Sequence, residues 1–413
     1  MSKHIAIYIS NKENKVQLIK RITAGELIPE LVTLKGSIFS EITLNRFIEE
    51  EMRHGRFDVK TQTNNSLKNS SEGERKRALL NHILTESNPD YIILDNAFDC
   101  LDINAQKQIK TRLEELSCTT SIVQITTRKR DILPFIDDVF TLETGVFKAF
   151  KSHGDLVESS KNYFIEALPK PLILNLNVFN PLISLKNVTI KYGDRPILNS
   201  INWDIKPGEF WQLIGPNGSG KSTILTLVSG DNPKGYQQDM TLFGIKKGSG
   251  ETVWDIKKNI GFYSSEMLRG FKRKDTLESM IISGFLDSIG LYKYPTDRQI
   301  SIAHQWLKLL NMYHIKDKSF QFLSSGHKRL ILLARAMVKH PPLLILDEPI
   351  NGLDDHDTKM FSELVNKIAK ESKTAIIYVS HRKEEHIKPD FIFELTPGKK
   401  GSTGKINNSF SIN

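Results

Sequence analysis

Residues 215–223 read GPNGSGKST, a glycine-rich stretch with one lysine and several hydroxyl side chains. An apolar run at 210–214 precedes it and a helix-like apolar run follows it, so a strand, a loop and a helix are expected in that order. Gly218 and Gly220 allow backbone N–H groups to turn inward, and the helix N-terminus adds its positive dipole. The pattern predicts a phosphate-binding loop, and an ordinary glycine turn is the less favoured interpretation.

The residue types within this loop suggest distinct contacts with a nucleotide. Lys221 is long enough to reach the β- and γ-phosphates, and Ser222 offers a hydroxyl oxygen to Mg²⁺. We therefore predict a nucleotide-binding loop with Ser222 as a metal ligand. Its members are Gly215, Pro216, Asn217, Gly218, Ser219, Gly220, Lys221, Ser222 and Thr223.

Further candidate residues follow two other apolar runs. Asp347 and Glu348 come directly after the run at 343–346, at the end of a strand where open α/β sheets bind ligands. Asp347 suits Mg²⁺ binding, and Glu348 suits positioning or deprotonating an attacking water. The run at 375–380 delivers His381 to the same edge, where it could bond a γ-phosphate, although a lone histidine is usually structural.

Two further features favour a nucleotide site. Ser324 and Gly326, in LSSGH at 323–327, stand where a helix would begin, because apolar residues then recur at helical spacing. Such a helix N-terminus could receive phosphate. Tyr192, in an expected hairpin over residues 181–200, could stack on a purine ring or be a core tyrosine.

Composition limits the class of protein. The 413 residues suffice for two domains, and the 39% apolar and 25% charged contents are those of a globular protein. A net charge of +9 is a weak signal for anionic partners over this length. The two cysteines, the charged N-terminus and the absence of an 18-residue apolar run predict a cytoplasmic protein without direct membrane insertion.

Together these motifs resemble the ATP-binding-cassette (ABC) ATPases, over about residues 182–395. The resemblance implies an α/β fold of the P-loop NTPase type, with ATP as ligand and Mg²⁺ as cofactor. It implies that Glu348 is the catalytic glutamate, His381 the switch histidine and Asp347 the aspartate that helps hold Mg²⁺. It also gives roles to Tyr192 in adenine stacking, to Ser324, Ser325 and Gly326 in the signature motif, and to Asp354 in the D-loop.

Two positions depart from the family pattern. Ser265, with Glu266 beside it, stands where the family has a glutamine that helps hold Mg²⁺ and couples the site to a permease. His327 replaces the glutamine that usually ends the signature, while Ser324 and Gly326 keep the family's residue types. The second change is therefore the milder one.

The first half of the chain is a copy of the second. YIILDNAFDCLD at 91–102 matches LLILDEPINGLD at 343–354 position for position. SSEGE at 70–74 matches LSSGH at 323–327, and QITTRKRD at 124–131 matches YVSHRKEE at 378–385. We interpret this as an internal duplication, with two ABC domains in tandem.

The residues expected to act on the nucleotide are replaced in the first copy. Asn96 stands where the second copy has Glu348, and an amide cannot accept a proton from water. Thr127 stands where the second copy has His381. This copy is therefore expected to lack catalysis.

The loop of the first copy is also degenerate. ISNKENKVQL at 9–18 aligns with GPNGSGKSTI, which puts Lys15 on Lys221 but Asn14 on a glycine and Val16 on the hydroxyl residue. We expect no normal MgATP binding there. The copy is also shorter, so the adenine-side hairpin and much of the helical arm should be missing.

Ser71 and Gly73 of the signature remain in the first copy, with Glu72 between them. In the family two cassettes pack head to tail, each ATP lying between one Walker A loop and the other signature. The resemblance thus implies one composite site, formed by the second copy's loop and the first copy's signature. Pairing within one chain and pairing in a homodimer both stay open.

The predicted organisation has four segments. Residues 1–149 form a shortened, degenerate ABC domain and residues 181–396 a competent one. Residues 150–180, with glycine, serine and proline, read as a linker with a short hairpin, and residues 397–413 as a disordered tail.

Residues 235–298 resemble the ModF or PhrA family of twin-cassette proteins, associated with molybdate transport. The resemblance implies an energising subunit that acts with a permease at the cytoplasmic face of a membrane. A ribosome-associated twin cassette is the first alternative, although the linker lacks the length and charge expected of one. A slow regulatory nucleotide switch is the second.

Overall fold

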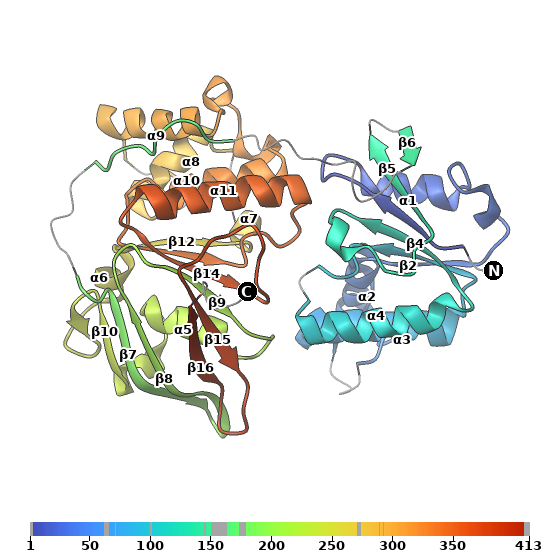
Figure 1. The fold of residues 1–413 in the computed structure, drawn as a ribbon, viewed down its shortest axis with the longest axis horizontal. Helices are drawn as coiled ribbons and strands as arrows, with labels where there is room; N and C mark the ends of the chain where they lie inside the picture. The colour runs from blue at the N-terminus through green and yellow to red at the C-terminus, as the bar shows by residue number, and fades with distance from the viewer. Residues whose placement is uncertain are drawn as a thin grey trace. The chain divides into compact units, whose positions relative to one another are not determined.

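The computed structural model describes residues 3–61, 66–70, 72–99, 101–143, 146–149, 163–172, 179–270, 274–288, 290–291 and 293–408. It divides into two units, one formed by Met1–Ser160 with Gly352–His356 and the other by Lys161–Asn351 with Asp357–Asn413. Each unit contains a six-stranded, mainly parallel sheet with helices packed on it (Figure 1). The predicted α/β fold class is confirmed.

The main sheet of the second unit has the strand order β12-β13-β14-β9-β15-β16. Its strands are β9 (Phe210–Ile214), β12 (Ile260–Ser264), β13 (Leu343–Asp347), β14 (Ala375–Ser380), β15 (Phe391–Thr396) and β16 (Thr403–Asn408). β13 and β14 are apolar almost throughout and buried, as central parallel strands with both faces covered must be. The apolar runs predicted as strands are therefore strands.

A second, antiparallel sheet has the order β11-β10-β7-β8. Its strands are β7 (Ile183–Tyr192), β8 (Arg195–Ile205), β10 (Asp239–Leu242) and β11 (Ile245–Lys246). β7 and β8 form a hairpin, as expected for residues 181–200, and β8 continues to Ile205. Trp203 of β8 stacks on Phe393 of β15 at 4.4 Å between ring centroids, so aromatic packing joins the two sheets.

Helices complete the second unit. They are α5 (Lys221–Val228), α6 (Val253–Lys257), α7 (Met267–Gly270), α8 (Leu277–Ile282), α9 (Asp297–Leu309), α10 (Ser325–Met337) and α11 (Asp355–Glu371). The apolar side of α5 is buried in the core between the two sheets, whereas α10 and α11 run along the other face of the main sheet (Figure 1). In the described part of the chain no helix is both long and apolar enough to cross a membrane.

The six-stranded sheet of the first unit has the order β2-β3-β4-β1-β5-β6. Its strands are β1 (Ile5–Tyr8), β2 (Gly36–Phe39), β3 (Tyr91–Asp95), β4 (Ser121–Thr126), β5 (Asp138–Glu143) and β6 (Val146–Ala149). When β1 is matched with β9 and β3 with β13, the two orders are the same. The internal repeat found in the sequence thus extends to strand topology.

Both faces of this sheet are covered. The helices are α1 (Lys15–Thr23), α2 (Glu41–His54), α3 (Glu72–His82) and α4 (Ile103–Ser117), and a π-helical turn, Ile83–Ser87, follows α3. One apolar cluster joins α2, α3 and α4 to the sheet, and another joins α1 to its opposite face. Among the described residues this unit has no antiparallel sheet like that of the second unit, as expected from its shorter sequence.

The tail predicted to be disordered, residues 397–413, is ordered in part. Thr403–Asn408 forms β16, an edge strand antiparallel to β15. Backbone bonds between Ser402 and β8 also hold it, because Ser402 N–H donates to the Ile197 carbonyl at 2.8 Å. The strand is polar and largely exposed, so backbone pairing stabilises it and hydrophobic periodicity does not reveal it. Residues 409–413 lie outside the described residues.

The predicted linker, residues 150–180, is also fixed in part. Phe164 is buried, and the N–H of Tyr163 donates to Glu363 of α11 at 2.8 Å. The N–H of Leu168 donates to Glu371, at the end of the same helix, at 3.2 Å. Residues 163–168 therefore pack on α11. The rest of the predicted linker lies mostly outside the described residues, and residues 163–172 contain no strand.

Candidate functional site

The glycine loop lies between the end of β9 and the start of α5, as predicted. Gly218 and Gly220 have φ of +75° and +95°, which side-chain-bearing residues rarely adopt. A Cβ at Gly220 would also lie 2.7 Å from Leu198 Cδ2. The loop conformation thus requires these glycines, and α5 presents its N-terminal backbone N–H groups beside it.

Lys221, the first residue of α5, folds back over the loop. Its Nζ donates to the carbonyl oxygens of Gly215 at 2.7 Å and Pro216 at 3.2 Å. The same atom lies 3.2 Å from Nδ1 of His381. The ammonium group therefore lies where the loop and the end of β14 meet, although 160 residues separate it from His381.

Glu348 follows β13 directly, and both of its carboxylate oxygens have partners. His381 Nε2 lies 2.7 Å from Oε1, and Nδ2 of Asn351 donates to Oε2 at 2.6 Å. The Glu348 N–H donates to the carbonyl of Val379 in β14 at 3.1 Å, and the residue has a φ of +47°. This left-handed conformation turns the chain away from the sheet directly after the strand.

The two adjacent carboxyl groups have different acidities. Burial raises the pKa of Asp347, and the neighbouring carboxylates of Glu348 and Glu266 add to this effect, so that its pKa is about 6 despite Lys221 and His381. Burial also raises the pKa of Glu348, but the hydrogen bond and charge of His381, with Lys221 and Asn351, outweigh it and lower that pKa. Glu348 is therefore ionised at neutral pH and can accept a proton.

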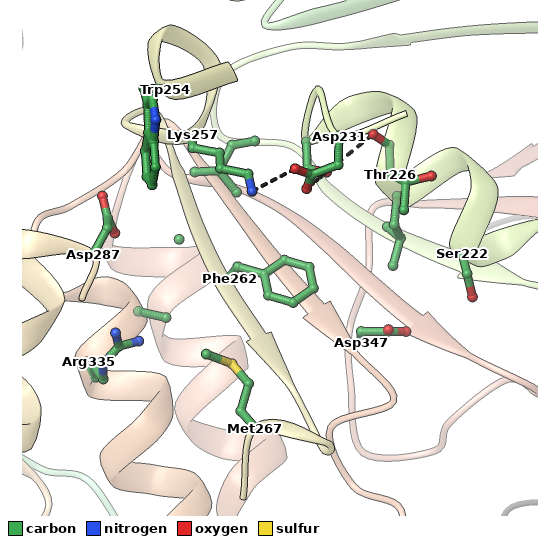
Figure 2. Close-up of a pocket in the computed structure, with 15 residues that line it drawn as sticks. Ser222, Thr226, Asp231, Trp254, Lys257, Phe262, Met267, Asp287, Arg335 and Asp347 are labelled. Atoms are coloured by element: carbon green, nitrogen blue, oxygen red, sulfur yellow. Dashed lines mark hydrogen bonds and ion pairs between the residues drawn. The ribbon is translucent and has the colours of Figure 1, made fainter. Parts of the chain in front are cut away.

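A divalent cation fits beside these groups. Ser222 and Asp347 line the same cavity, so a hydroxyl and a carboxylate oxygen, which Mg²⁺ prefers, are available from α5 and β13 (Figure 2). Burial first, and then the nearby carboxylates of Glu348 and Glu266, raise the pKa of Asp347, and a cation would offset the repulsion between these carboxylates. Ser265 follows β12, and its N–H donates weakly to the Asp347 carbonyl at 3.4 Å.

That cavity has a volume of about 430 Å³ and extends from the glycine loop to α6 (Figure 2). Apolar side chains of α5, β12, α6 and α7 form much of its lining, and the Lys257–Asp231 ion pair, 2.7 Å long, lies at its wall. Trp254 stands at the end opposite Ser222 and is 71% exposed. Sequence reasoning missed this surface.

A buried ion pair lies directly before α6, the helix that carries Trp254. Lys247 Nζ lies 3.0 Å from Glu251 Oε1, and both side chains are almost fully buried. Burial alone would raise the pKa of Glu251, but the N–H of Gly248 and the ammonium of Lys247 lower it to about 2. A capping box between Thr252 and the Asp three residues later then begins α6. Sequence reasoning missed both features, although the Thr-x-x-Asp spacing is a signal for a helix start.

The remaining predicted residues of the second unit have other contacts. Tyr192 is 46% exposed at the end of β7, and its hydroxyl accepts from Asn232 Nδ2 at 2.8 Å. Ser324 caps α10, because its Oγ accepts from the N–H of His327 at 3.3 Å. Ser324, Ser325 and Gly326 are not among the described residues that line the cavity.

The first unit has the same framework without these side chains. Its α1 begins at Lys15 as α5 begins at Lys221, but Asn14 caps the helix with a φ of −83°. Lys15 Nζ pairs with Asp95 at 3.3 Å. The lysine is thus held by the aspartate of its own unit, in a loop without the left-handed glycines of the second unit.

The turn after β3 repeats the turn after β13. Asn96 has a φ of +43°, close to that of Glu348, and its N–H donates to Ile125 at 3.0 Å. Its Oδ1 accepts from the Thr127 N–H at 3.2 Å. Gly73 lies in the first turn of α3. Ser71 lies outside the described residues.

Comparison with known proteins agrees with this architecture. A family model described as ABC transporter matches residues 198–351. The chain is 39% identical to ABC transporter ATP-binding protein ModF of Escherichia coli (strain K12), over 80% of this chain and 70% of that protein. It is 31% identical to an uncharacterized ABC transporter ATP-binding protein of Schizosaccharomyces pombe, over 78% and 66%.

Solved structures include a similar chain. The structure of cbiO1 from Clostridium perfringens, described as part of the ABC transporter complex cbiONQ, is 25% identical with a TM-score of 0.48. The match covers 55% of this chain and 88% of that one.

The two lysines provide a direct test of which loop binds nucleotide. Lys221→Ala should weaken binding of a fluorescent ATP analogue about tenfold or more, because a charged donor to phosphate is lost. Lys15→Ala should leave the affinity unchanged, because Lys15 is paired with Asp95. A clear loss of affinity in Lys15→Ala would show that the first loop also binds nucleotide.

Proposed function

The chain belongs to the family of ABC transporter ATP-binding proteins, whose members bind and hydrolyse ATP, and we propose that its second unit carries the working site. The observation that carries this proposal is the contact series from Lys221 through His381 to Glu348 beside the glycine loop. Each of these groups follows a different strand of one sheet, and their types match the needs of phosphoanhydride hydrolysis.

The contacts described above and the family resemblance support the following proposed roles. The N–H groups of the loop and Lys221 bind the β- and γ-phosphates of ATP, and Tyr192 stacks on the adenine. Glu348, ionised because its pKa is lowered, takes the proton of the attacking water. His381 holds the Glu348 carboxylate and lies beside the ammonium of Lys221, where it can bond the γ-phosphate.

Ser222 and Asp347 would hold Mg²⁺. When bound, the ion neutralises charge that develops on the phosphate oxygens. Both side chains line the cavity that begins at the glycine loop, which supports this assignment.

The signature that completes the site comes, in this proposal, from the first unit. Ser71 and Gly73 are the residues assigned to it, and Gly73 lies at the start of α3 as Gly326 lies at the start of α10. The first unit has lost the proposed catalytic side chains but keeps the strand order and this helix start. A role as the partner half of one composite ATP site is consistent with both facts.

Transport is the process that ATP hydrolysis would drive. The curated relative ModF is named an ABC transporter ATP-binding protein, and we infer that this chain is the energising subunit of such a system. We propose a membrane permease as partner, on the cytoplasmic side, and molybdate as solute, the latter from the family resemblance alone. The exposed, partly apolar cavity end at Trp254 is the surface proposed to meet the permease.

Replacing the proposed base tests the mechanism. Glu348→Gln should lower ATP hydrolysis at least a hundredfold while ATP still binds, because an amide cannot accept the proton of water. Phosphate release and nucleotide binding would be measured on the same preparation. Glu394→Gln, the same change at an exposed position of β15, serves as the control. Substantial turnover by Glu348→Gln would remove Glu348 from this role.

Arginine substitutions distinguish the two modes of cassette pairing. Ser71→Arg should slow turnover about tenfold without weakening ATP binding, because bulk and charge would obstruct the closed composite site. Ser324→Arg, at the matching position of the second unit, should affect turnover much less. The reverse result would indicate that second units of two copies pair with each other.

Photo-crosslinking tests the proposed partner. A photoreactive amino acid at position 254 should crosslink to an integral membrane protein in native cells, identified by mass spectrometry. The same group in place of Tyr294, a fully exposed side chain of the second unit, should not. Crosslinks from position 254 to ribosomal proteins would contradict the transport role.

A further inference from the structure

The turn after β13 holds a residue that motif-based reasoning left without a role. Asn351 Nδ2 donates to Glu348 Oε2 at 2.6 Å, and the Asn351 N–H approaches the Glu348 carbonyl at 3.4 Å. His381 contacts the other carboxylate oxygen at 2.7 Å. The carboxylate is thus held from two directions, by the end of β14 and by its own turn.

A buried arginine fixes the backbone of that turn. Arg329 is 5% exposed, and its guanidinium donates to the carbonyl oxygens of Pro349 and Asn351. It lies on α10, three residues after Gly326 of the signature. Because a guanidinium presents its donors in a rigid fork, it fixes both carbonyls at once. The amide of Asn351 therefore projects from a backbone that the signature helix holds.

The first unit has the same turn and the same kind of support. Lys76, 7% exposed and three residues after Gly73, donates through Nζ to the Asp99 carbonyl at 2.6 Å. The Asp99 N–H donates to the Asn96 carbonyl at 3.2 Å, as in the second unit. The backbone arrangement therefore does not depend on catalytic side chains.

The two turns carry the same two kinds of side chain, an amide and a carboxylate, in exchanged positions. The second unit has Glu348 followed by Asn351, whereas the first unit has Asn96 followed by Asp99. Each turn thus contains one carboxylate and one amide, in opposite positions. An aspartate at position 351 would place two negative charges together, whereas an asparagine donates a hydrogen bond to the carboxylate.

We propose that Asn351 is a positioning residue for ATP hydrolysis, which orients the Glu348 carboxylate through its amide while Arg329 holds the Asn351 backbone. The inference rests on the proposed function of Glu348 as base. The amide of Asn351 limits rotation of the Glu348 carboxylate, so that Asn351 and His381 together fix its orientation. Its loss should therefore slow the chemical step and leave nucleotide binding intact.

Steady-state kinetics of full-length variants test the proposal. Asn351→Ala should lower kcat about tenfold with the KM and Kd for ATP unchanged, and Asn351→Asp should lower kcat further. Asn351→Ser keeps a donor and should retain most of the activity. Asp99→Ala, at the matching position of the first unit, is the control and should keep the original kcat.

The control variants distinguish failure of the positioning role from failure of the proposed function. A wild-type kcat in Asn351→Ala, with Glu348→Gln inactive, would overturn the positioning role alone. Turnover by Glu348→Gln would instead overturn the proposed function. If Asn351→Ser were as slow as Asn351→Ala, or Asp99→Ala slowed turnover equally, the amide contact would not be the cause. A folding defect in Asn351→Ala would appear as a changed Kd for ATP. The nearly isosteric Asn351→Asp would then test the role, because a lowered kcat supports it and an unchanged kcat contradicts it.

Discussion

Parallel pairing of β14 with β13 on one side and β9 on the other is the constraint on which the candidate site depends. The ends of these strands are in register, since Asp347 lies opposite Val379 and Ser380 opposite Ile214. Side chains that directly follow the strands must therefore meet at one edge. The strand register alone therefore brings motifs that are far apart in the chain within hydrogen-bonding distance.

The first unit shows that this constraint is independent of the chemistry. Its strands β3, β4 and β1 have the same order, and Asn96 keeps the left-handed backbone found at Glu348. Backbone ladders and apolar packing maintain that geometry, whereas the side chains proposed to be catalytic contribute little to it. Lys15 and Asp95 satisfy each other at 3.3 Å, so loss of the glycine loop leaves no unpaired charge at that position.

The sequence predicted the parts that depend on local pattern. Apolar runs such as Leu343–Asp347 become central strands because both faces are buried, and the glycine loop needs its residue types for backbone reasons. β16 was missed because an exposed edge strand carries no apolar alternation. Phe164 was assigned to a linker because its partner, α11, is some 200 residues away along the chain.

Side-chain contacts were predicted least well. Lys247 and Glu251 are charged residues in a glycine-containing loop, a pattern typical of a solvated turn, yet they form a buried pair. The contact of Asn351 with Glu348 depends on the left-handed φ of Glu348, which the neighbouring residue types do not predict. Both features arise from tertiary geometry, which decides the rotamer and the burial of each side chain.

Helix α10 connects two of the features that sequence reasoning missed, the cavity and the contact of Asn351. Arg329 holds the turn that carries Asn351, whereas Arg335, two turns further along, lines the cavity that ends at Trp254. Arg335 also donates to Ser283 Oγ and the Ser288 carbonyl at 3.0 Å, which ties α10 to the residues that follow α8. Side chains of one helix therefore contact both the turn that carries Asn351 and the wall of the cavity.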